Sequence, residues 1–433
     1  MSKRRVGALG ALVAVGSIIA AACGSDAKSA DETTAATTAA GGAATTAAGG
    51  AATTAAKYPA IPDGPIKLGV SVPLSGATAA FGIAAQKSFE GVTQKQFDAA
   101  YPNGIAGHKV QIVVVDDASD VTKAVNVANQ FVQDKVAAVI TLSYNPAAAP
   151  QQAAIFNKNK IPMIVSQGLT EYTDVSKWPY MFGISSSLPQ NGEQEAKWVA
   201  KHTEVKKIAV LTDNTPNNQE SQTQFETQLK KLAPAASVVK TAQITPGATD
   251  VSAAVATLKA ENPDLLIVRA SFAFGPIWNA IKSASWTPKI ITGAGAWYDG
   301  FDVAISTGVA NNMMAAYTTC LKDQNVKLDP QITALMDGYA PIFGTSSINY
   351  LTFVNTDNVP VELLKLAIEK NNSIDGEAIK NGLETIGAKK FWNTLDYNIT
   401  PTNHFGLTGD FGPALCSMWP VSNDKYRIPY YAS

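Results

Sequence analysis

The stretch VQIVVVDDASDVTKAVNVANQFV (110–132) decides the fold class, because a strand signal, a cap and a helix signal follow one another directly. Val110–Val115 is a run of mostly β-branched residues, typical of a strand buried on both faces of a parallel sheet. Ser119 and Asp120 can cap a helix, and apolar residues then return at the i, i+3, i+4 and i+7 positions of an amphipathic helix. The stretch therefore predicts one strand–helix unit of an α/β domain.

The same alternation extends from this stretch in both directions. Apolar runs at 66–73, 136–142 and 161–166 predict further strands, with helical segments between them. A second series follows, with strands predicted at 208–212, 237–241, 264–268 and 289–292 and helices near 219–232, 251–258 and 274–284. Apolar strands separated by helices indicate parallel sheets covered on both faces. The expected fold class is α/β, with two doubly wound parallel-sheet lobes joined by a hinge.

The length of 433 residues suggests two or three domains. The last stretch, 320–433, is too fragmentary for a third core, so we divide it between the two lobes. The first lobe is predicted to comprise 58–186 and 319–400, and the second 187–318 and 401–433. Ligands of open α/β sheets bind at the carboxyl ends of the strands, so we expect a site between the lobes.

The N-terminus has the pattern of an export signal. Three basic residues at 3–5 precede an uncharged stretch, 6–22, which ends Ala-Ala-Ala directly before Cys23. This predicts a signal peptide over 1–22. The junction resembles a bacterial lipobox, in which the Cys is lipidated and anchors the protein to the outer side of the cell membrane. The alternative is an ordinary signal with an incidental Cys23. Residues 23–57 repeat TTAAGGAA and are predicted to form a low-complexity tether.

The charged and metal-ligating residues exclude several classes of function. The 34 basic and 35 acidic residues give a net charge of −1, and removing the three positive charges of 1–22 gives −1 − 3 = −4. This balance argues against a nucleic-acid-binding protein. His108, His202 and His404 lack metal-ligand spacing and are expected on the surface or in loops, so we expect neither a metal nor a cofactor. Asp116 and Asp117 are interpreted as turn and capping residues. No nucleophile elbow or P-loop occurs, so we do not expect an enzyme.

Two cysteines remain once Cys23 is assigned to lipid. Cys320 and Cys416 form an even pair in an exported protein, which makes a disulfide plausible. Two free buried thiols are the alternative.

Three segments resemble a known family. They are IKLGVSVPLSGATAAFG (66–82), VVVDDASDVTKAVNVANQFV (113–132) and IPMIVSQGLT (161–170), and they resemble the branched-chain amino acid type (Leu/Ile/Val-binding-like) of ABC transporter solute-binding lipoprotein. The resemblance implies the type I periplasmic-binding fold, a clamshell that closes on a small-molecule ligand. It also implies ABC permease subunits as partners, and we expect a monomer.

The resemblance implies a set of ligand-binding residues at the strand ends. A small polar residue after the third strand, here Asn145, and donors after the fourth strand, here Gly168, Leu169 and Thr170, would hold a carboxylate. Phe81 corresponds to an aromatic residue that covers the ligand. The residues expected from the second lobe are Asn217, in place of a common Tyr, and the aromatic Phe272 and Trp297. The alternatives to ligand binding are loop or cap chemistry for Asn145 and Thr170 and a core position for Phe81.

One departure from the family pattern bears on the ligand. The family often places an acidic residue after a second-lobe strand, where this chain reads TGAGAW (292–297) without a carboxylate. An unpaired ammonium group in a closed cleft is costly, so we expect a solute with a carboxylate or another acceptor-rich head and an uncharged body, which can be aromatic. The solute need not be a standard amino acid, and a related organic acid or amide also fits this description. Arg269 is an alternative anion contact.

The leading interpretation is an extracytoplasmic solute receptor of an ABC importer. Three alternatives stay open: a tethered ligand-sensing receptor that signals to a membrane partner, a cell-envelope hydrolase, and a receptor that has lost solute binding.

Overall fold

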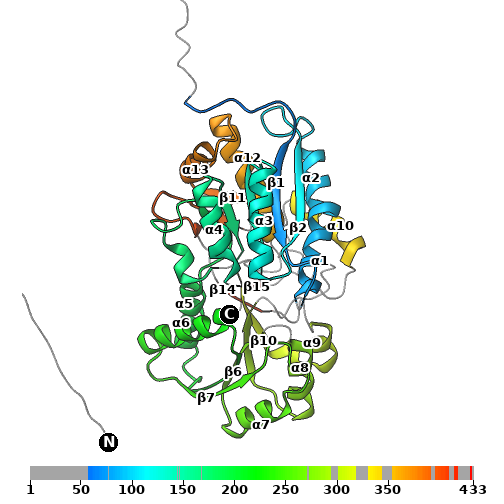
Figure 1. Cartoon of the computed structure of the whole chain (residues 1–433). Helices are drawn as coiled ribbons and strands as arrows, with labels where there is room; N and C mark the ends of the chain where they lie inside the picture. The colour runs from blue at the N-terminus through cyan, green and yellow to red at the C-terminus, as the bar shows by residue number, and fades with distance from the viewer. Residues whose placement is uncertain are drawn as a thin grey trace, which may run out of the picture. The chain divides into compact units, whose positions relative to one another are not determined.

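The chain folds into two lobes, each built on one mostly parallel sheet (Figure 1). The computed structural model describes residues 57–76, 78–143, 145, 147–166, 168–270, 273–293, 301–317, 330–343, 354–391, 395–408, 414–417 and 430–431. The predicted signal peptide, Cys23 and nearly all of the tether lie outside the described residues. No helix in the described part is long and apolar enough to cross a membrane.

The first lobe contains five parallel strands in the order β2-β1-β3-β4-β5. Its strands are β1 (Ile66–Val72), β2 (Val110–Asp116), β3 (Ala138–Thr141), β4 (Met163–Val165) and β5 (Met181–Gly183). Its helices up to this point are α1 (Ala79–Ser88), η1 (Phe89–Thr93), α2 (Gln94–Ala100), α3 (Val121–Gln133), α4 (Ala148–Lys158) and η2 (Thr170–Thr173).

The second lobe repeats this strand order and adds two antiparallel strands, in the sequence β15-β14-β10-β9-β8-β6-β7. Its strands are β6 (Lys207–Asp213), β7 (Ser237–Ile244), β8 (Leu265–Arg269), β9 (Lys289–Gly293), β10 (Met313–Tyr317), β14 (Ala414–Ser417) and β15 (Tyr430–Tyr431). Its helices are α5 (Leu188–Lys201), α6 (Pro216–Leu232), α7 (Ser252–Ala260), α8 (Phe274–Ser283), α9 (Phe301–Thr307) and η4 (Val309–Asn312).

Both sheets are buried on both faces, which confirms the doubly wound fold class. Successive strand residues point to opposite faces of a sheet. Accordingly Ile140 packs into a cluster with α12 residues, whereas its neighbour Val139 packs into another with α3 and α4 residues. In the second lobe Leu266 faces α7 and α8, and Ile267 faces α5 and α6.

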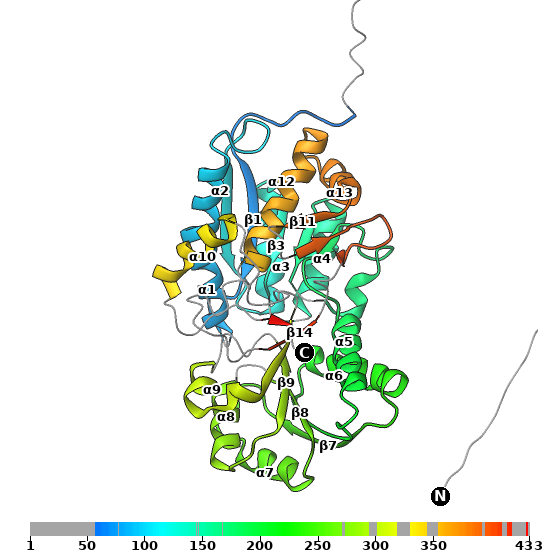
Figure 2. The same cartoon turned by 180° about the vertical axis from the view of Figure 1, so that it is seen from behind.

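The C-terminal third returns to the first lobe before it ends in the second. Its elements are α10 (Pro330–Phe343), η5 (Val354–Asn358), α12 (Val359–Asn371), α13 (Gly376–Thr385) and a small sheet of β11 (Lys389–Phe391), β12 (Leu395–Tyr397) and β13 (Leu407–Thr408). Figure 2 shows α12 across the face of the first sheet. Phe405 and Leu407 pack into first-lobe clusters, so this lobe extends past the boundary that we predicted at residue 400.

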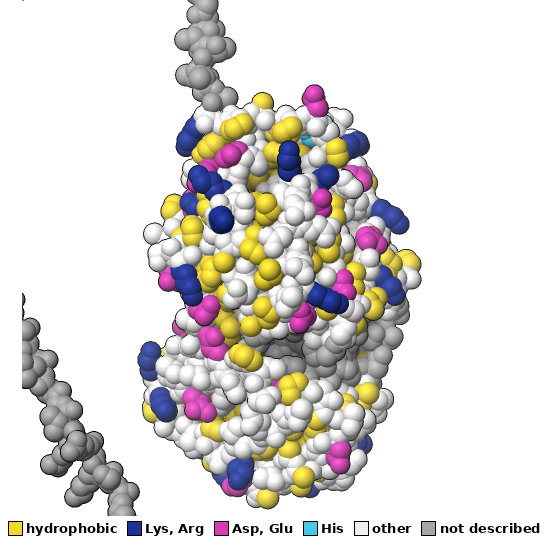
Figure 3. Space-filling model, viewed as in Figure 1, with side chains coloured by type: hydrophobic (Ala, Val, Ile, Leu, Met, Phe, Trp, Pro, Cys, Tyr) yellow, Lys and Arg dark blue, Asp and Glu magenta, His cyan; other side chains and the backbone are white. Residues whose placement is uncertain are grey.

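Charged side chains of both signs are interspersed over the face of the molecule drawn in Figure 3, which agrees with the near-neutral charge of the chain. The described elements pass from one lobe to the other between β5 and α5, between β10 and α10, and between β13 and β14. Only the first of these crossovers, 184–187, is described throughout.

Candidate functional site

The loops at the carboxyl ends of the first three strands form one hydrogen-bonded layer. Asp116 accepts bonds from the main-chain N–H groups of Leu74 (2.7 Å) and Ala118 (2.8 Å) and from the Ser75 hydroxyl (2.6 Å). Burial alone would raise the pKa of Asp116, but these hydrogen bonds lower it below its ordinary value. The hydroxyls of Thr78 and Ser119 lie 2.8 Å apart and join the loops after β1 and β2.

A buried polar network lies directly below this layer. Asp117 is fully buried, and its carboxylate accepts bonds from the Ser71 hydroxyl at 2.7 Å and the Ser119 N–H at 2.8 Å. Gln152 of α4 donates to Ser71 (3.0 Å) and accepts from Thr141 (3.1 Å). Burial raises the pKa of Asp117, although the hydrogen bonds oppose the shift. The two aspartates therefore have the turn role predicted from the sequence, whereas the residue that caps α3 is Asp120, which accepts from the Lys123 N–H at 2.9 Å.

Asn145 joins the same layer through its side-chain amide. Its Nδ2 donates to the Ser119 carbonyl at 3.0 Å, and its Oδ1 accepts from the Ala147 N–H at 3.0 Å. The amide thus connects the loops after β2 and β3, in keeping with the loop chemistry that we gave as its alternative role.

The loop after β4 brings Gly168, Leu169 and Thr170 to the boundary with the second lobe. Gly168 is buried against the first crossover, and its carbonyl accepts from the Leu188 N–H at 2.7 Å. Leu169 is buried in a first-lobe cluster. Thr170 is exposed, and its N–H donates to Glu220 Oε1 at 2.8 Å, while its hydroxyl bonds to the same oxygen. Of the three, Thr170 is the residue whose donors face the other lobe.

The opposite side of the boundary is the N-terminal half of α6. The buried Asp213, at the end of β6, accepts bonds from the Thr215 hydroxyl (2.6 Å) and the Asn218 amide (2.8 Å). Within the described part of the chain its Oδ2 has no hydrogen-bond partner. These bonds fix the first turn of α6, which carries the half-buried Asn217. Glu220 follows three residues later on the same helix, so one helix presents both residues.

Glu220 and Asp213 were not singled out in the sequence. The predicted helix began at 219, whereas α6 begins at Pro216. Thr215-Pro216 is a usual helix start, with proline at the first helical position, and that signal could have placed Glu220 one turn inside the helix.

Of the three aromatic residues predicted for the site, the structure describes Phe81 alone. Phe81 lies in α1, is 6% exposed and packs into a first-lobe core cluster. Phe272 and Trp297 lie outside the described residues. Of the predicted cysteines, Cys320 is likewise outside them, and Cys416 lies in β14 opposite Ala315 of β10.

Arg269 is not an anion contact, contrary to the alternative raised from the sequence. Its guanidinium donates to both oxygens of Glu195, at 3.1 and 2.5 Å, and to Gln222 Oε1 at 3.1 Å. Arg269 and Glu195 are both buried. Because Arg269 ends β8 with its side chain on the helix face, it connects the sheet to α5 and α6 and has this structural role.

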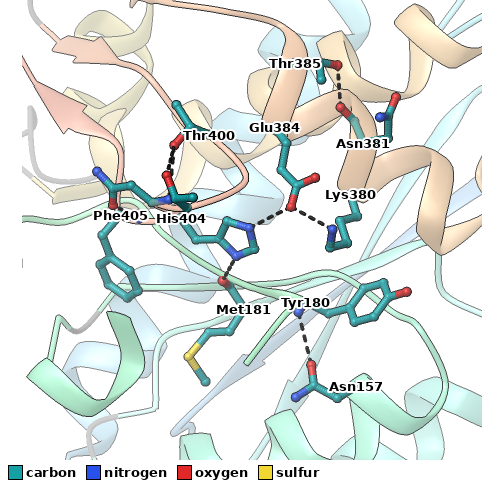
Figure 4. Close-up of polar contacts among 12 residues, drawn as sticks. Asn157, Tyr180, Met181, Lys380, Asn381, Glu384, Thr385, Thr400, His404 and Phe405 are labelled. Atoms are coloured by element: carbon teal, nitrogen blue, oxygen red, sulfur yellow. Dashed lines mark hydrogen bonds and ion pairs between the residues drawn. The ribbon is translucent and has the colours of Figure 1, made fainter. Parts of the chain in front are cut away.

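His404 lies in the loop between β12 and β13, in agreement with the expected loop position, but it is buried and not on the surface. One ring nitrogen lies 2.9 Å from the Met181 carbonyl and the other 2.9 Å from Glu384, which also pairs with Lys380 at 2.8 Å (Figure 4). The His404 carbonyl accepts from the Gly183 N–H, so this segment covers the edge of β5. Burial lowers the pKa of His404, and its hydrogen bonds oppose that shift. The cluster joins α13 to β5.

No group of three or more His, Cys, Asp or Glu side chains among the described residues could hold a metal ion. The chemistry that the described site offers is hydrogen bonding: the N–H and O–H of Thr170 are aimed at a carboxylate.

Comparison with known proteins places the chain in a family. A family model described as periplasmic binding protein matches residues 65–408. Leu/Ile/Val-binding protein homolog 1 of Brucella abortus is 29% identical over 196 residues, 45% of this chain, and the match spans about half (51%) of that protein's length.

Solved structures share the fold. A branched-chain amino acid transporter substrate-binding protein from Streptococcus pneumoniae, in complex with isoleucine, has a TM-score of 0.64 at 20% identity and covers 85% of this chain and 99% of its own. An ABC transporter solute-binding protein from Rhodopseudomonas palustris, in complex with benzoate, has a TM-score of 0.63 at 17% identity, covering 82% of this chain and 93% of its own. With the match of the family model over most of its two lobes, this chain belongs to the periplasmic binding protein family.

Proposed function

We propose that the chain is the extracytoplasmic solute-binding receptor of an ABC importer, and that it captures a small organic solute by closing its two lobes. The observation that carries this proposal is the pair of Thr170 donors, which hold a carboxylate oxygen presented by α6 of the other lobe. A solute that contacts both lobes has a higher affinity for the closed form than for the open form. A solute drives closure only through such a difference in affinity for the two forms.

The proposed solute carries a carboxylate and an uncharged body. Isoleucine and benzoate, the ligands in the two structures of similar fold, both carry a carboxylate and an apolar hydrocarbon group, and isoleucine carries an ammonium group as well. Main-chain N–H and side-chain O–H groups hold an anion without a full countercharge. The residues that we propose as neighbours of the rest of the solute are Phe81, Asn145, Asn217, Phe272 and Trp297.

We propose that Cys23 carries the lipid anchor and that 23–57 is the tether, so that a monomeric receptor reaches permease subunits in the same membrane. A Cys23→Ala chain expressed in the native host tests the anchor. The variant is expected in the soluble extracellular fraction, and membrane retention equal to that of the unchanged chain would contradict anchoring through Cys23.

Native mass spectrometry of the protein purified from its own host tests the receptor function. We expect one retained small organic acid per chain, released unchanged on unfolding. Chemical conversion of the bound compound would instead indicate a hydrolase. A chain that neither retains nor responds to any solute would contradict the proposal.

A further inference from the structure

A carboxylate of the protein itself occupies the donors that we assign to the solute. Glu220 Oε1 accepts from the Thr170 N–H at 2.8 Å and from the Thr170 hydroxyl. Gln224, one turn further along α6, donates to the Thr170 hydroxyl oxygen at 3.4 Å. Both hydrogen-bonding groups of Thr170 that could face a solute are therefore bound by one helix of the second lobe.

Close helix packing holds Glu220 in this position. A methyl group on Gly192 of α5 would lie 2.8 Å from main-chain atoms of both Gln224 and Phe225, so α5 and α6 lie in direct backbone contact there. The bonds of Asp213 fix the first turn of α6. Since α5 begins directly after the crossover 184–187, the position of Glu220 is coupled to the angle of the hinge.

We propose that Glu220 is a built-in competitor for the solute's carboxylate, which holds the lobes together in the solute-free protein and must be displaced when a carboxylate binds. This rests on the proposed function. Two carboxylates cannot share the same two donors, and like charges at hydrogen-bonding distance repel each other. Solute binding therefore exchanges one charge-assisted hydrogen-bonded pair for another.

This exchange makes Glu220 a determinant of affinity and specificity. The binding free energy that an anionic solute obtains at Thr170 is only the difference between its own hydrogen bonds to Thr170 and those that Glu220 gives up. A neutral solute can bind while the hydrogen bonds between Thr170 and Glu220 stay intact, so its binding does not include the cost of breaking them. Removal of Glu220 is expected to strengthen binding of the anion selectively, by about tenfold for the loss of one competing charged hydrogen-bond pair.

Calorimetry with benzoate and its neutral analogue benzamide tests the proposal on the chain without its signal peptide. We expect Glu220→Ala to bind benzoate about tenfold more tightly than the unchanged chain and benzamide within twofold of it. Glu171→Gln is the matched control, because it removes a negative charge next to Thr170 whose contact is with Lys177 at 3.7 Å. It is expected to change neither affinity by more than twofold.

Small-angle scattering without solute supplies an independent measurement. Glu220→Ala is expected to have a larger radius of gyration than the unchanged chain and Glu171→Gln, because the contact between the lobes is lost. If benzoate does not bind the unchanged chain, this larger radius still supports the contact while the proposed solute class fails. An unchanged radius, or benzoate binding that Glu220→Ala leaves equal or weaker, overturns the proposal.

Discussion

The main-chain N–H of Leu188 donates a hydrogen bond to the carbonyl oxygen of Gly168 at 2.7 Å, which joins the start of α5 to the loop after β4. A methyl group on Gly168 would lie 2.3 Å from the Ser186 carbonyl oxygen and 2.7 Å from the Ser187 α-carbon. Glycine is therefore required here because the first crossover packs directly against this loop. The residues that lead to Thr170 are also the residues that support the hinge.

Gly168→Ala is predicted to lower the free energy of unfolding by about 1–3 kcal/mol, because the backbone of the crossover must move to admit the methyl group. Gly293→Ala is the matched control, since a methyl group there meets nothing within 4 Å. We expect it to change stability by less than about 0.5 kcal/mol. Urea denaturation measures the free energy of unfolding of both variants. Equal stability of the two would contradict the prediction, because it would show that the crossover admits the methyl group without a loss of stability.

Glu195→Gln is predicted to destabilise the second lobe by about 3–5 kcal/mol, because it leaves the buried Arg269 charge without its countercharge. The double variant Glu195→Leu with Arg269→Met removes both charges and is expected to recover most of that loss. Chemical denaturation at neutral pH provides the comparison. A double variant that is less stable than the single one would contradict this account of the pair.

Asp357 is predicted to make stability depend on pH. Burial raises its pKa from 3.8 to about 7, although side-chain hydrogen bonds from Ser88 and Thr356 oppose the shift. Because the pKa is higher in the folded state, the contribution of Asp357 to the free energy of unfolding is fully present below about pH 4. This contribution is lost as the pH rises through 7. Asp357→Asn should flatten the profile of unfolding free energy and exceed the unchanged chain at pH 8, by on the order of 2–4 kcal/mol.

The exposed Asp134 supplies the control for this profile, and Asp134→Asn is expected to follow the unchanged chain from pH 4 to 8. Equal pH profiles of the Asp357→Asn variant and the unchanged chain would contradict the cost assigned to ionising Asp357.

A disulfide between Cys320 and Cys416 remains a prediction. Ala315 lies opposite Cys416 in the ladder between β10 and β14, so a bridge requires the chain to turn back toward β14 after Tyr317. Mass spectrometry after alkylation without reductant decides the question. A bridged protein takes up no label at these two positions, and full labelling of both would exclude the bridge.

The α/β alternation was predictable because the strands are continuous apolar runs. Val139 and Ile140 face opposite sides of a sheet that is covered on both, so neither face needed polar residues. The position of 401–408 was not predictable in this way. His404 and Phe405 bind the edge of β5 through long-range contacts with Met181 and Gly183, which leave no periodic pattern in the sequence.

In the candidate site, contacts within one loop could be predicted from the sequence. Contacts with a segment far away along the chain could not. Thr170 followed from the family resemblance, whereas its partner Glu220 is 50 residues away along the chain. Arg269 was open to two interpretations because strand residues alternate between faces, and only the packed helices show that its charge meets Glu195.

Calorimetry of the unchanged mature chain with pairs of carboxylates and their amides decides whether the Thr170 donors capture a solute's carboxylate between the lobes. The pairs are benzoate with benzamide and isoleucine with isoleucinamide. We expect that at least one of the two carboxylates binds at one site per chain, at least about tenfold more tightly than its amide. An amide that binds as tightly as its carboxylate, or the absence of binding by both carboxylates, would contradict it.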